Sequence, residues 1–300
     1  MNVLITGATG FIGKNLSLKL FEKGYNIYAL TRNPHKKFNE KIKFVLWDGK
    51  EIKEKIGENL YGIINLVGEN IFSLLYTENK KKKIIESRIN SIRAIYEFIK
   101  RENLKPEVFI QASAIGYYGN SYDEKNEYSP PGKGFLSKVC IEWEKESEKI
   151  EEMGIRRCVI RMGIVLGKGG FLSKFSPFLK TPFLPFIGKK ENYISFIHIE
   201  DLINGIIFLL ENKGSRGIYN FVSPNYLKMK EFYEIFAKVL NKKLIKIPNF
   251  IFKILMGEMN EEIIFFNNRV IPEKLLKENF NFQFPDLEIS LKNIFCNYTI

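Results

Sequence analysis

The first 31 residues alternate between apolar runs and one helical segment. Residues 2–6 and 25–31 are short apolar runs of the kind that forms buried strands. The segment between them ends at Gly24, a glycine placed to terminate a helix, and carries apolar side chains at Leu16, Leu18, Leu20 and Phe21. A strand, a helix and a second strand within about 30 residues predict a βαβ unit.

The same alternation continues as far as Gly167, and further strands and helices are expected beyond it. We expect further strands at 43–47, 62–66, 107–112, 157–161, 194–199 and 217–222. Helices are expected at 80–100, 135–153, 201–210 and 230–240. Strands that alternate with helices predict an α/β fold of the Rossmann type, in which helices cover both faces of a doubly wound parallel sheet.

The alternation weakens after Gly167, and this divides the chain. We predict a Rossmann core over residues 1–225, with a substrate-side insertion at about 168–195, and a smaller C-terminal substrate-side region over 226–300. Residues 171–187 of the insertion are rich in Phe and Pro. They are consistent with a loop or lid over a pocket, although we favour aromatic side chains that fill the core of the smaller region.

Composition narrows the class of protein. Hydrophobic residues make up 45% of the chain and charged residues 27%, which is ordinary for a globular protein. The net charge of +12 is spread along the chain, so we expect no nucleic-acid partner.

No apolar run reaches the ~20 residues of a membrane span, and no signal peptide is evident. Cys140, Cys158 and Cys296 are predicted to be free thiols. We therefore expect a cytoplasmic protein without a membrane partner, and a homodimer is left open.

The chemistry-bearing motif is the glycine turn between the first strand and the first helix. Gly7, Gly10 and Gly13 have the spacing Gly-x-x-Gly-x-x-Gly. Glycines allow the backbone to approach a pyrophosphate closely, and the helix N-terminus offers unpaired N–H groups to its charge. Because this turn follows a strand and opens a helix, we predict a dinucleotide-binding site there.

The end of the second strand bears on the choice of cofactor. NAD-binding enzymes often carry Asp or Glu at this point to bind the ribose 2′-hydroxyl, whereas this chain reads Leu30-Thr31-Arg32-Asn33. A guanidinium can bind a 2′-phosphate instead. We predict NADP(H) as the preferred cofactor, with NAD(H) possible; the alternative is that Arg32 is merely solvated.

Several stretches resemble one known family. The opening TGATGFIG, the strand end Asn65-Leu66-Val67-Gly68, the stretch 111–119 (QASAIGYYG) and the stretch 161–167 (RMGIVLG) are similar to the NAD-dependent epimerase/dehydratase superfamily, the extended short-chain dehydrogenase/reductases. The stretch 269–275 (RVIPEKL) resembles the C-terminal domain of unknown function in its small "epimerase family protein" subgroup, a segment expected at about 248–297.

The resemblance implies which residues contact the cofactor. Those implied to hold the pyrophosphate are Gly7, Thr9, Gly10, Phe11, Ile12 and Gly13. Thr31 and Arg32 would lie beside the adenosine ribose. Leu66, Val67 and Gly68 would pack along the cofactor, and Val165 would lie near the nicotinamide.

The catalytic pattern departs from the family. The family uses Ser or Thr with a Tyr-x-x-x-Lys pair, in which the Tyr passes a proton and the Lys lowers its pKa. Ser113 matches the Ser, but Lys138 requires a Tyr at position 134, where Gly134 stands. Tyr117 or the neighbouring Tyr118 can supply a phenol, or can pack or line a substrate site. We name Ser113, Tyr117 and Lys138 as catalytic candidates.

Three further polar residues are weaker candidates. Arg161 can meet a substrate anion or pair with a carboxylate in the sheet. His198 is expected to make structural hydrogen bonds rather than act as a base. Asp201 is expected to cap the helix that follows it.

Two functions remain open from the sequence. The first is an NADP(H)-dependent oxidoreductase or epimerase-like enzyme that acts on a small molecule, for example a sugar derivative. The second is a non-catalytic NADP(H)-binding regulator or interaction protein that kept the fold and lost the catalytic acid. The missing tyrosine favours the second, whereas Ser113 and a substrate-side C-terminal region favour the first.

Overall fold

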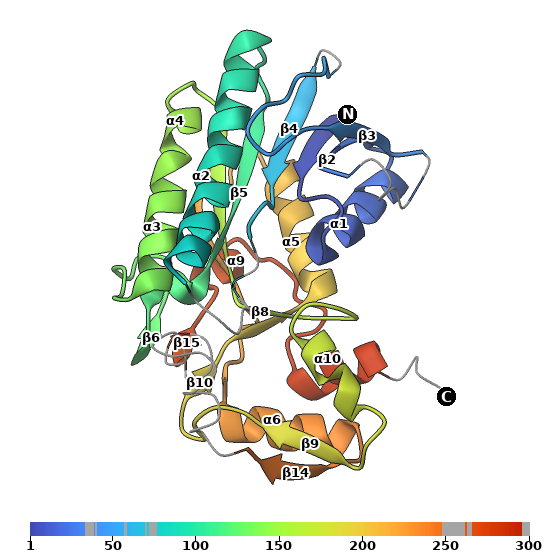
Figure 1. Ribbon diagram of the computed structural model, residues 1–300, viewed down its shortest axis with the longest axis vertical. Helices are drawn as coiled ribbons and strands as arrows, with labels where there is room; N and C mark the ends of the chain where they lie inside the picture. Colours follow the sequence, from blue (N-terminus) through green and yellow to red (C-terminus); the bar gives the residue numbers. More distant parts are fainter. Residues whose placement is uncertain are drawn as a thin grey trace.

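A seven-stranded parallel sheet is the centre of the computed structural model, which describes residues 1–33, 39, 41–56, 59–69, 71, 77–247, 262 and 266–295 (Figure 1). Every neighbouring pair in it is parallel. In spatial order the strands are β3 (Lys43–Leu46), β2 (Asn26–Thr31), β1 (Asn2–Thr6), β4 (Leu60–Asn65), β5 (Val108–Ala114), β7 (Arg156–Met162) and β12 (Gly217–Phe221).

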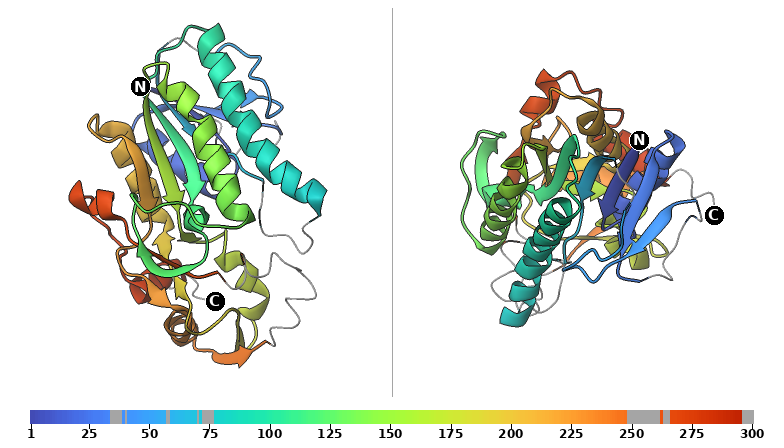
Figure 2. Two further views of the ribbon diagram at one scale, coloured as in Figure 1. Left: turned by 90° about the vertical axis from the view of Figure 1, so that its left-hand side faces the viewer. Right: turned by 90° about the horizontal axis from the view of Figure 1, so that it is seen from above.

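Helices cover both faces of this sheet, as Figures 1 and 2 show. Val3 and Ile5 of β1 pack against α1 (Phe11–Glu22) and α5 (Ile199–Glu211). Leu4 between them points to the other face, in one core with α2 (Glu78–Arg101), α3 (Phe135–Glu146) and α4 (Glu148–Glu151). Burial on two faces explains the nearly continuous apolar strands. The predicted doubly wound, Rossmann-type α/β fold is confirmed.

The strand order reverses between β1 and β4. Strands on one side of this point follow the order β1-β2-β3, and those on the other side follow β4-β5-β7-β12. The loops that leave the carboxyl ends of β1 and β4 therefore diverge and leave a crevice, which is where open α/β sheets bind their ligands.

Smaller elements lie beyond the sheet in the lower part of Figure 1. Short strands pair two by two among the described residues, namely β10 with β13, β11 with β8, β14 with β9 and β15 with β6. Their bounds are β6 (Ser121–Lys125), β8 (Ile164–Leu166), β9 (Phe183–Phe186), β10 (Tyr193–Ile194), β11 (Phe196–His198), β13 (Leu227–Lys228), β14 (Lys243–Lys246) and β15 (Asn268–Val270). The helices are η1 (Ile115–Tyr118), η2 (Leu172–Phe178), α6 (Met229–Val239), α9 (Glu273–Lys277) and α10 (Leu287–Phe295).

The Phe- and Pro-rich stretch 171–187 contributes to the core of this smaller part. Phe175 and Phe186 are buried there together with Phe232 and Phe236 of α6 and Leu291 of α10. Phe175 and Phe236 meet edge to face, with ring centroids 5.3 Å apart. The stretch forms η2 and β9, so its aromatic side chains fill a core, which is the interpretation that the sequence favoured.

Two predicted elements are divided in the structure. The helix expected at 135–153 is interrupted at Ser147, whose hydroxyl donates to the carbonyl of Glu144 at 2.5 Å, and α3 and α4 lie on either side. The strand expected at 194–199 is two short strands, β10 and β11, separated by Ser195. Hydrophobic pattern alone carries no signal for these breaks, because buried apolar residues occur on both sides of each one.

His198 caps the start of helix α5, so the prediction that Asp201 is the cap is wrong. The Nδ1 atom of His198 accepts a hydrogen bond from the backbone N–H of Glu200 at 3.2 Å. Asp201 lies inside the helix, and its carboxylate accepts from the N–H groups of Gln283 and Phe284 at 2.8 and 2.9 Å. The helix starts two residues earlier than expected, so Asp201 ties it to the C-terminal segment instead.

The capping role of His198 gives a pH dependence of stability. Burial lowers the pKa of His198 to about 4, whereas histidine in an unfolded chain has a pKa of about 6.5. Between these values the unfolded chain binds a proton that the folded chain does not, so stability falls as the pH is lowered. In urea unfolding, we expect the wild type to lose stability from pH 6.5 to 4 relative to His198→Asn, which keeps a cap acceptor. Parallel profiles of the two proteins would contradict this.

Two of the three cysteines lie in the described part of the chain. Cys140 and Cys158 are free, as predicted, and the structure buries both of them, while Cys296 lies outside the described residues. Burial raises the pKa of each described thiol to about 11. Among the described residues, no helix is both long enough and apolar enough to cross a membrane.

Candidate functional site

The glycine turn lies at the end of β1 and leads into α1. Gly7 has a φ of +69°, and the N–H of Gly10 donates to its carbonyl oxygen at 3.0 Å. A Cβ atom on Gly13 would lie 2.2 Å from the same oxygen, so the first turn of α1 requires glycine there. Within the described chain, no side chain caps α1 and no acidic residue lies in its first turn. Its N-terminal N–H groups therefore suit an anion.

The residues that follow the turn pack against the core and against the loop after β8. The ring of Phe11 lies against the loop after β8, where Cβ atoms on Gly167 and Gly169 would come within 2.6 and 2.5 Å of it. Phe11, Ile12 and Val165 all pack against the core that the sheet forms with α1 and α5. These residues thus hold the helix and the loop together.

A cavity of about 610 Å³ opens from the glycine turn. The residues of the sequence prediction that line it are Gly7, Thr9, Gly10, Thr31, Arg32, Leu66, Val67 and Gly68. Phe11, Ile12, Gly13 and Val165 do not line it. The cavity thus runs from the glycine turn to the end of β2, which is the path expected for the adenosine half of a dinucleotide.

The sequence interpretation missed a second group of lining residues. The loop after β3 contributes Trp47, Asp48, Gly49 and Lys50, and α2 contributes Lys83, Glu86, Ser87 and Asn90. The sequence places the first loop directly after a predicted strand, but only the structure shows that this strand, β3, neighbours β2. The α2 residues carry no signal in the sequence, because only the packing of that helix brings them to the cavity.

Polar groups hold the opposite wall of the cavity in place. Asn65 at the end of β4 is buried and donates to Ser91 of α2 and Gln111 of β5, at 3.1 and 2.9 Å. The backbone N–H of Glu69 donates to Ser87 at 3.0 Å. Lys80 forms an ion pair with Glu69 at 2.7 Å, and its hydrogen bond keeps the pKa of that carboxyl low.

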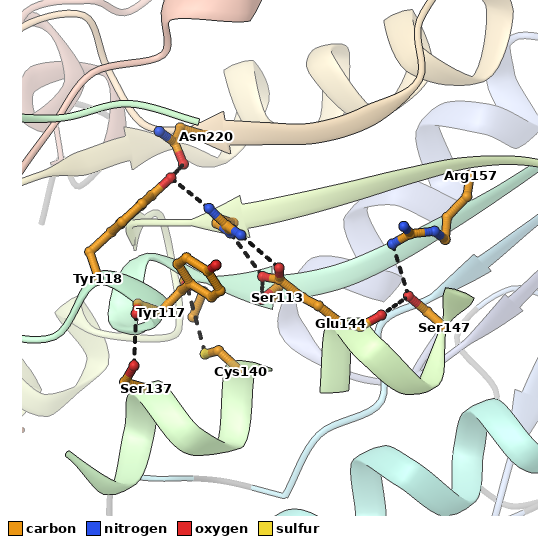
Figure 3. A network of polar contacts seen from close by, with 11 residues as sticks. Ser113, Tyr117, Tyr118, Ser137, Cys140, Glu144, Ser147, Arg157 and Asn220 are labelled. Carbon is orange, nitrogen blue, oxygen red and sulfur yellow. Dashed lines mark hydrogen bonds and ion pairs between the residues drawn. The ribbon is translucent and has the colours of Figure 1, made fainter. Parts of the chain in front are cut away.

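The predicted catalytic Ser113 lies in a buried ionic cluster (Figure 3). Its side chain is 1% exposed and donates to Glu144 of α3 at 2.6 Å. Arg161 of β7 binds the same carboxylate with two hydrogen bonds, at 2.9 and 2.7 Å. Burial alone lowers the pKa of Arg161, but Glu144 raises it well above its usual range. Of the two roles considered for Arg161, the carboxylate pair is the one observed, but the carboxylate lies on helix α3 and not in the sheet as predicted.

The two tyrosines after β5 differ in their surroundings. Tyr118 is buried, donates to Asn220 at 2.8 Å and accepts from Arg161 at 2.9 Å. Burial raises the pKa of Tyr118 to about 12, so it stays protonated. Tyr117 is half-buried, and the guanidinium of Arg161 lies 3.3 Å from the centre of its ring. The Tyr117 hydroxyl forms no hydrogen bond with another described residue, which leaves it available to a ligand.

The structure does not bring Lys138 to this cluster. Its side chain is 70% exposed, and its ammonium lies 3.9 Å from Glu142 on the same helix. By contrast, Ser113 donates a hydrogen bond to Glu144, and the ring of Tyr117 lies against the guanidinium of Arg161. The three catalytic candidates therefore do not form the usual constellation.

The carboxylate of Glu262 lies beside Gly134, the position at which the family pattern has its tyrosine. Gly134, with a φ of +109°, precedes α3, and both oxygens of Glu262 accept from the first N–H groups of that helix. The distances are 2.9 Å to Phe135 and 2.8 Å to Leu136. A Cβ on Gly134 would lie 2.9 Å from the Glu262 carboxyl carbon. A side chain at 134 and Glu262 in this position therefore exclude each other.

Sequence comparison identifies the relatives of this chain. Residues 3–221 match the model of the NAD dependent epimerase/dehydratase family, and residues 247–294 match a domain of unknown function, DUF1731. An epimerase family protein of Bacillus subtilis, YfhF, is 33% identical over 306 residues, covering 99% of each chain. The epimerase family protein SAR0825 of Staphylococcus aureus is 31% identical over 301 residues, covering 97% of this chain and 98% of that protein.

Solved structures agree with this result. The human epimerase family protein SDR39U1 (isoform 2), crystallised with NADPH, superposes with a TM-score of 0.89 at 26% identity, over 99% of this chain and all of that one (100%). The UDP-glucose 4-epimerase of Thermus thermophilus, in complex with NAD, has a TM-score of 0.76 over 100% of both chains, and its 16% identity supports the fold alone. The chain belongs to the NAD-dependent epimerase/dehydratase family and carries the C-terminal domain of its "epimerase family protein" members.

Proposed function

We propose that this protein binds NADP(H) and acts as an oxidoreductase or epimerase-like enzyme on a small molecule. One observation carries the cofactor part of the proposal. The cavity begins at an uncapped helix N-terminus and ends at Arg32, so it offers N–H groups for a pyrophosphate and a guanidinium for a 2′-phosphate. The human relative crystallised with NADPH supports the same choice of cofactor.

The residues present fit such a ligand. Gly7, Thr9 and Gly10 would hold the pyrophosphate, with Gly13 keeping α1 close to the turn. Leu66 to Gly68 would pack along the cofactor, and Thr31 and Arg32 would lie by the adenosine ribose. When bound, the nicotinamide supplies or accepts a hydride.

The proposed preference for NADP(H) can be measured directly. We expect NADPH to bind purified protein at least about tenfold more tightly than NADH, roughly 1.4 kcal/mol, and Arg32→Ala to lose this preference. Arg93→Ala is the matched control, because Arg93 is exposed and pairs with Glu146 at 3.1 Å, away from the cavity. Titration by fluorescence or calorimetry with NADPH, NADH, NADP⁺ and NAD⁺ tests this. If no dinucleotide binds, the glycine turn is only architecture.

In the enzyme, Tyr117 is the candidate for proton transfer. Its hydroxyl forms no hydrogen bond with the described residues, whereas the hydroxyl of Tyr118 is hydrogen-bonded to Arg161 and Asn220. In a reduction, its proton would go to the substrate oxygen while hydride reaches the carbonyl carbon, and solvent would return the proton. A substrate with a carbonyl or hydroxyl group, such as a sugar derivative, fits this chemistry.

A second function is favoured by a separate observation. Ser113 donates to Glu144, and Lys138 lies at the surface. Neither the serine nor the lysine is therefore placed as in the usual catalytic site. Such an arrangement suits a protein that binds NADP(H) without turning it over. Two assays decide between the two: oxidation of NADPH in the presence of aldehydes and ketones, and conversion of nucleotide sugars into their epimers, which returns the hydride and consumes no cofactor. Turnover in either assay supports the enzyme, and tight NADPH binding without turnover in both supports the regulator.

A further inference from the structure

A second loop meets the end of β2 at the cavity. Strand β3 pairs with β2, with Leu46 opposite Thr31, and the N–H of Trp47 then donates to the carbonyl of Thr31 at 3.1 Å. Trp47 is 6% exposed and anchors the chain at this point. The residues that follow, Asp48 to Lys50, are therefore fixed beside Arg32.

Hydrogen bonds and a glycine determine the shape of this loop. The carboxylate of Asp48 accepts from the backbone N–H groups of Lys50 and Glu51, at 2.7 and 2.8 Å. Gly49 has a φ of +89°, which a residue with a side chain rarely adopts. A Cβ on Gly49 would lie 3.8 Å from Cδ of Arg32, so the turn packs along the stem of that arginine. Lys50 thus lines the same cavity as Arg32, from the neighbouring strand.

The charges in the cavity favour an anion. Each carboxylate that lines it has a partner: Glu69 pairs with Lys80 at 2.7 Å, Glu86 with Lys82 at 3.7 Å, and Asp48 is bound by two N–H groups. These N–H groups lower the pKa of Asp48, so it is ionised at neutral pH. The lining cations Arg32, Lys50 and Lys83 form no ion pair with any described residue.

We propose that Lys50 binds the 2′-phosphate of NADP(H) together with Arg32. This inference rests on the proposed function and adds to it a second specificity-determining residue. A phosphate monoester carries a charge of about −1.5 to −2 at neutral pH, so one guanidinium does not neutralise it. The ionised Asp48 nearby increases the need for a second cation. Arg32 at the end of β2 and Lys50 after β3 would hold the phosphate from two adjacent strands.

The test compares ligands that differ only by the 2′-phosphate. Adenosine 2′,5′-bisphosphate is titrated against adenosine 5′-monophosphate, and NADPH against NADH, with wild type, Arg32→Ala and Lys50→Ala. Lys53→Ala is the matched control, because it removes the same charge from the same loop. The side chain of Lys53 is 74% exposed and does not line the cavity. Lys83→Ala removes a cation from the α2 wall of the cavity.

For Lys50→Ala we expect about tenfold weaker binding of the two 2′-phosphorylated ligands, and a change of at most about twofold for the other two. Lys53→Ala should leave all four affinities unchanged, and Lys83→Ala should leave the ratio of NADPH to NADH affinity unchanged.

Two results would overturn the assignment of Lys50. One is a Lys50→Ala protein that keeps the wild-type preference while Arg32→Ala loses it. The other is an equal loss in Lys53→Ala, which would indicate a general field rather than a contact. A failure of the proposed function looks different, because the wild type itself would then bind no dinucleotide or bind NADH as tightly as NADPH.

Discussion

Replacing Glu144 with glutamine is expected to lower the free energy of unfolding by about 3–5 kcal/mol. The side chains of Arg161 and Glu144 are 4% and 8% exposed, so the change leaves a buried guanidinium without its counter-charge. Ser113 loses its carboxylate acceptor at the same time. Urea unfolding at neutral pH measures the loss.

The control for this variant lies on the same helix. Glu142→Gln removes the same charge from α3, but Glu142 is 40% exposed and 3.9 Å from Lys138, so we expect a change within about 0.5 kcal/mol. Replacing the pair together, as Glu144→Leu with Arg161→Met, should restore much of the stability, because no uncompensated charge remains. A loss below about 1 kcal/mol in Glu144→Gln would mean that water or another group reaches Arg161.

Restoring the family's tyrosine should destabilise this protein instead of repairing it. Gly134→Tyr recreates the Tyr-x-x-x-Lys spacing, but it places a side chain at a φ of +109° and against the carboxyl group of Glu262. Left-handed backbone costs a residue with a side chain roughly 1–2 kcal/mol, and loss of the hydrogen bonds to the start of α3 adds about 1 kcal/mol. We therefore expect a loss of about 2–3 kcal/mol in chemical unfolding, and no tighter binding of NADPH.

Gly154 provides the matched control for backbone strain. It also has a positive φ, +83°, but a Cβ there would meet nothing within 4 Å. Gly154→Tyr should therefore cost only the backbone term, and the difference between the two variants reports the contact with Glu262. Equal losses in the two variants would show that Glu262 moves aside freely.

The part of the cavity around the glycine turn could be predicted from the sequence, because its shape depends on local geometry. The glycine spacing at Gly7, Gly10 and Gly13 describes one turn and one helix start, and the absence of a carboxylate after Leu30 is a single-position feature. The loop at Asp48 and Lys50 required knowledge of which strand neighbours β2, and strand order is a tertiary property.

The buried cluster around Ser113 could not be predicted from the sequence, since its contacts join distant parts of the chain. Ser113 and Arg161 were both noticed, but Glu144 joins them across 31 and 17 residues, and sequence spacing carries no sign of that. Asp201 followed the rule for a helix cap and instead binds backbone 82 residues away. Glu262 beside Gly134 is the clearest case, since the glycine and the carboxylate explain each other only in three dimensions.

By itself, then, the sequence determined the doubly wound sheet and the dinucleotide turn, because hydrophobic periodicity and glycine conformation act over a few residues. The tertiary structure decided what each buried polar side chain does. A buried charge or hydroxyl must find a partner, and that partner is whichever group the packing brings near, however far away it lies along the chain.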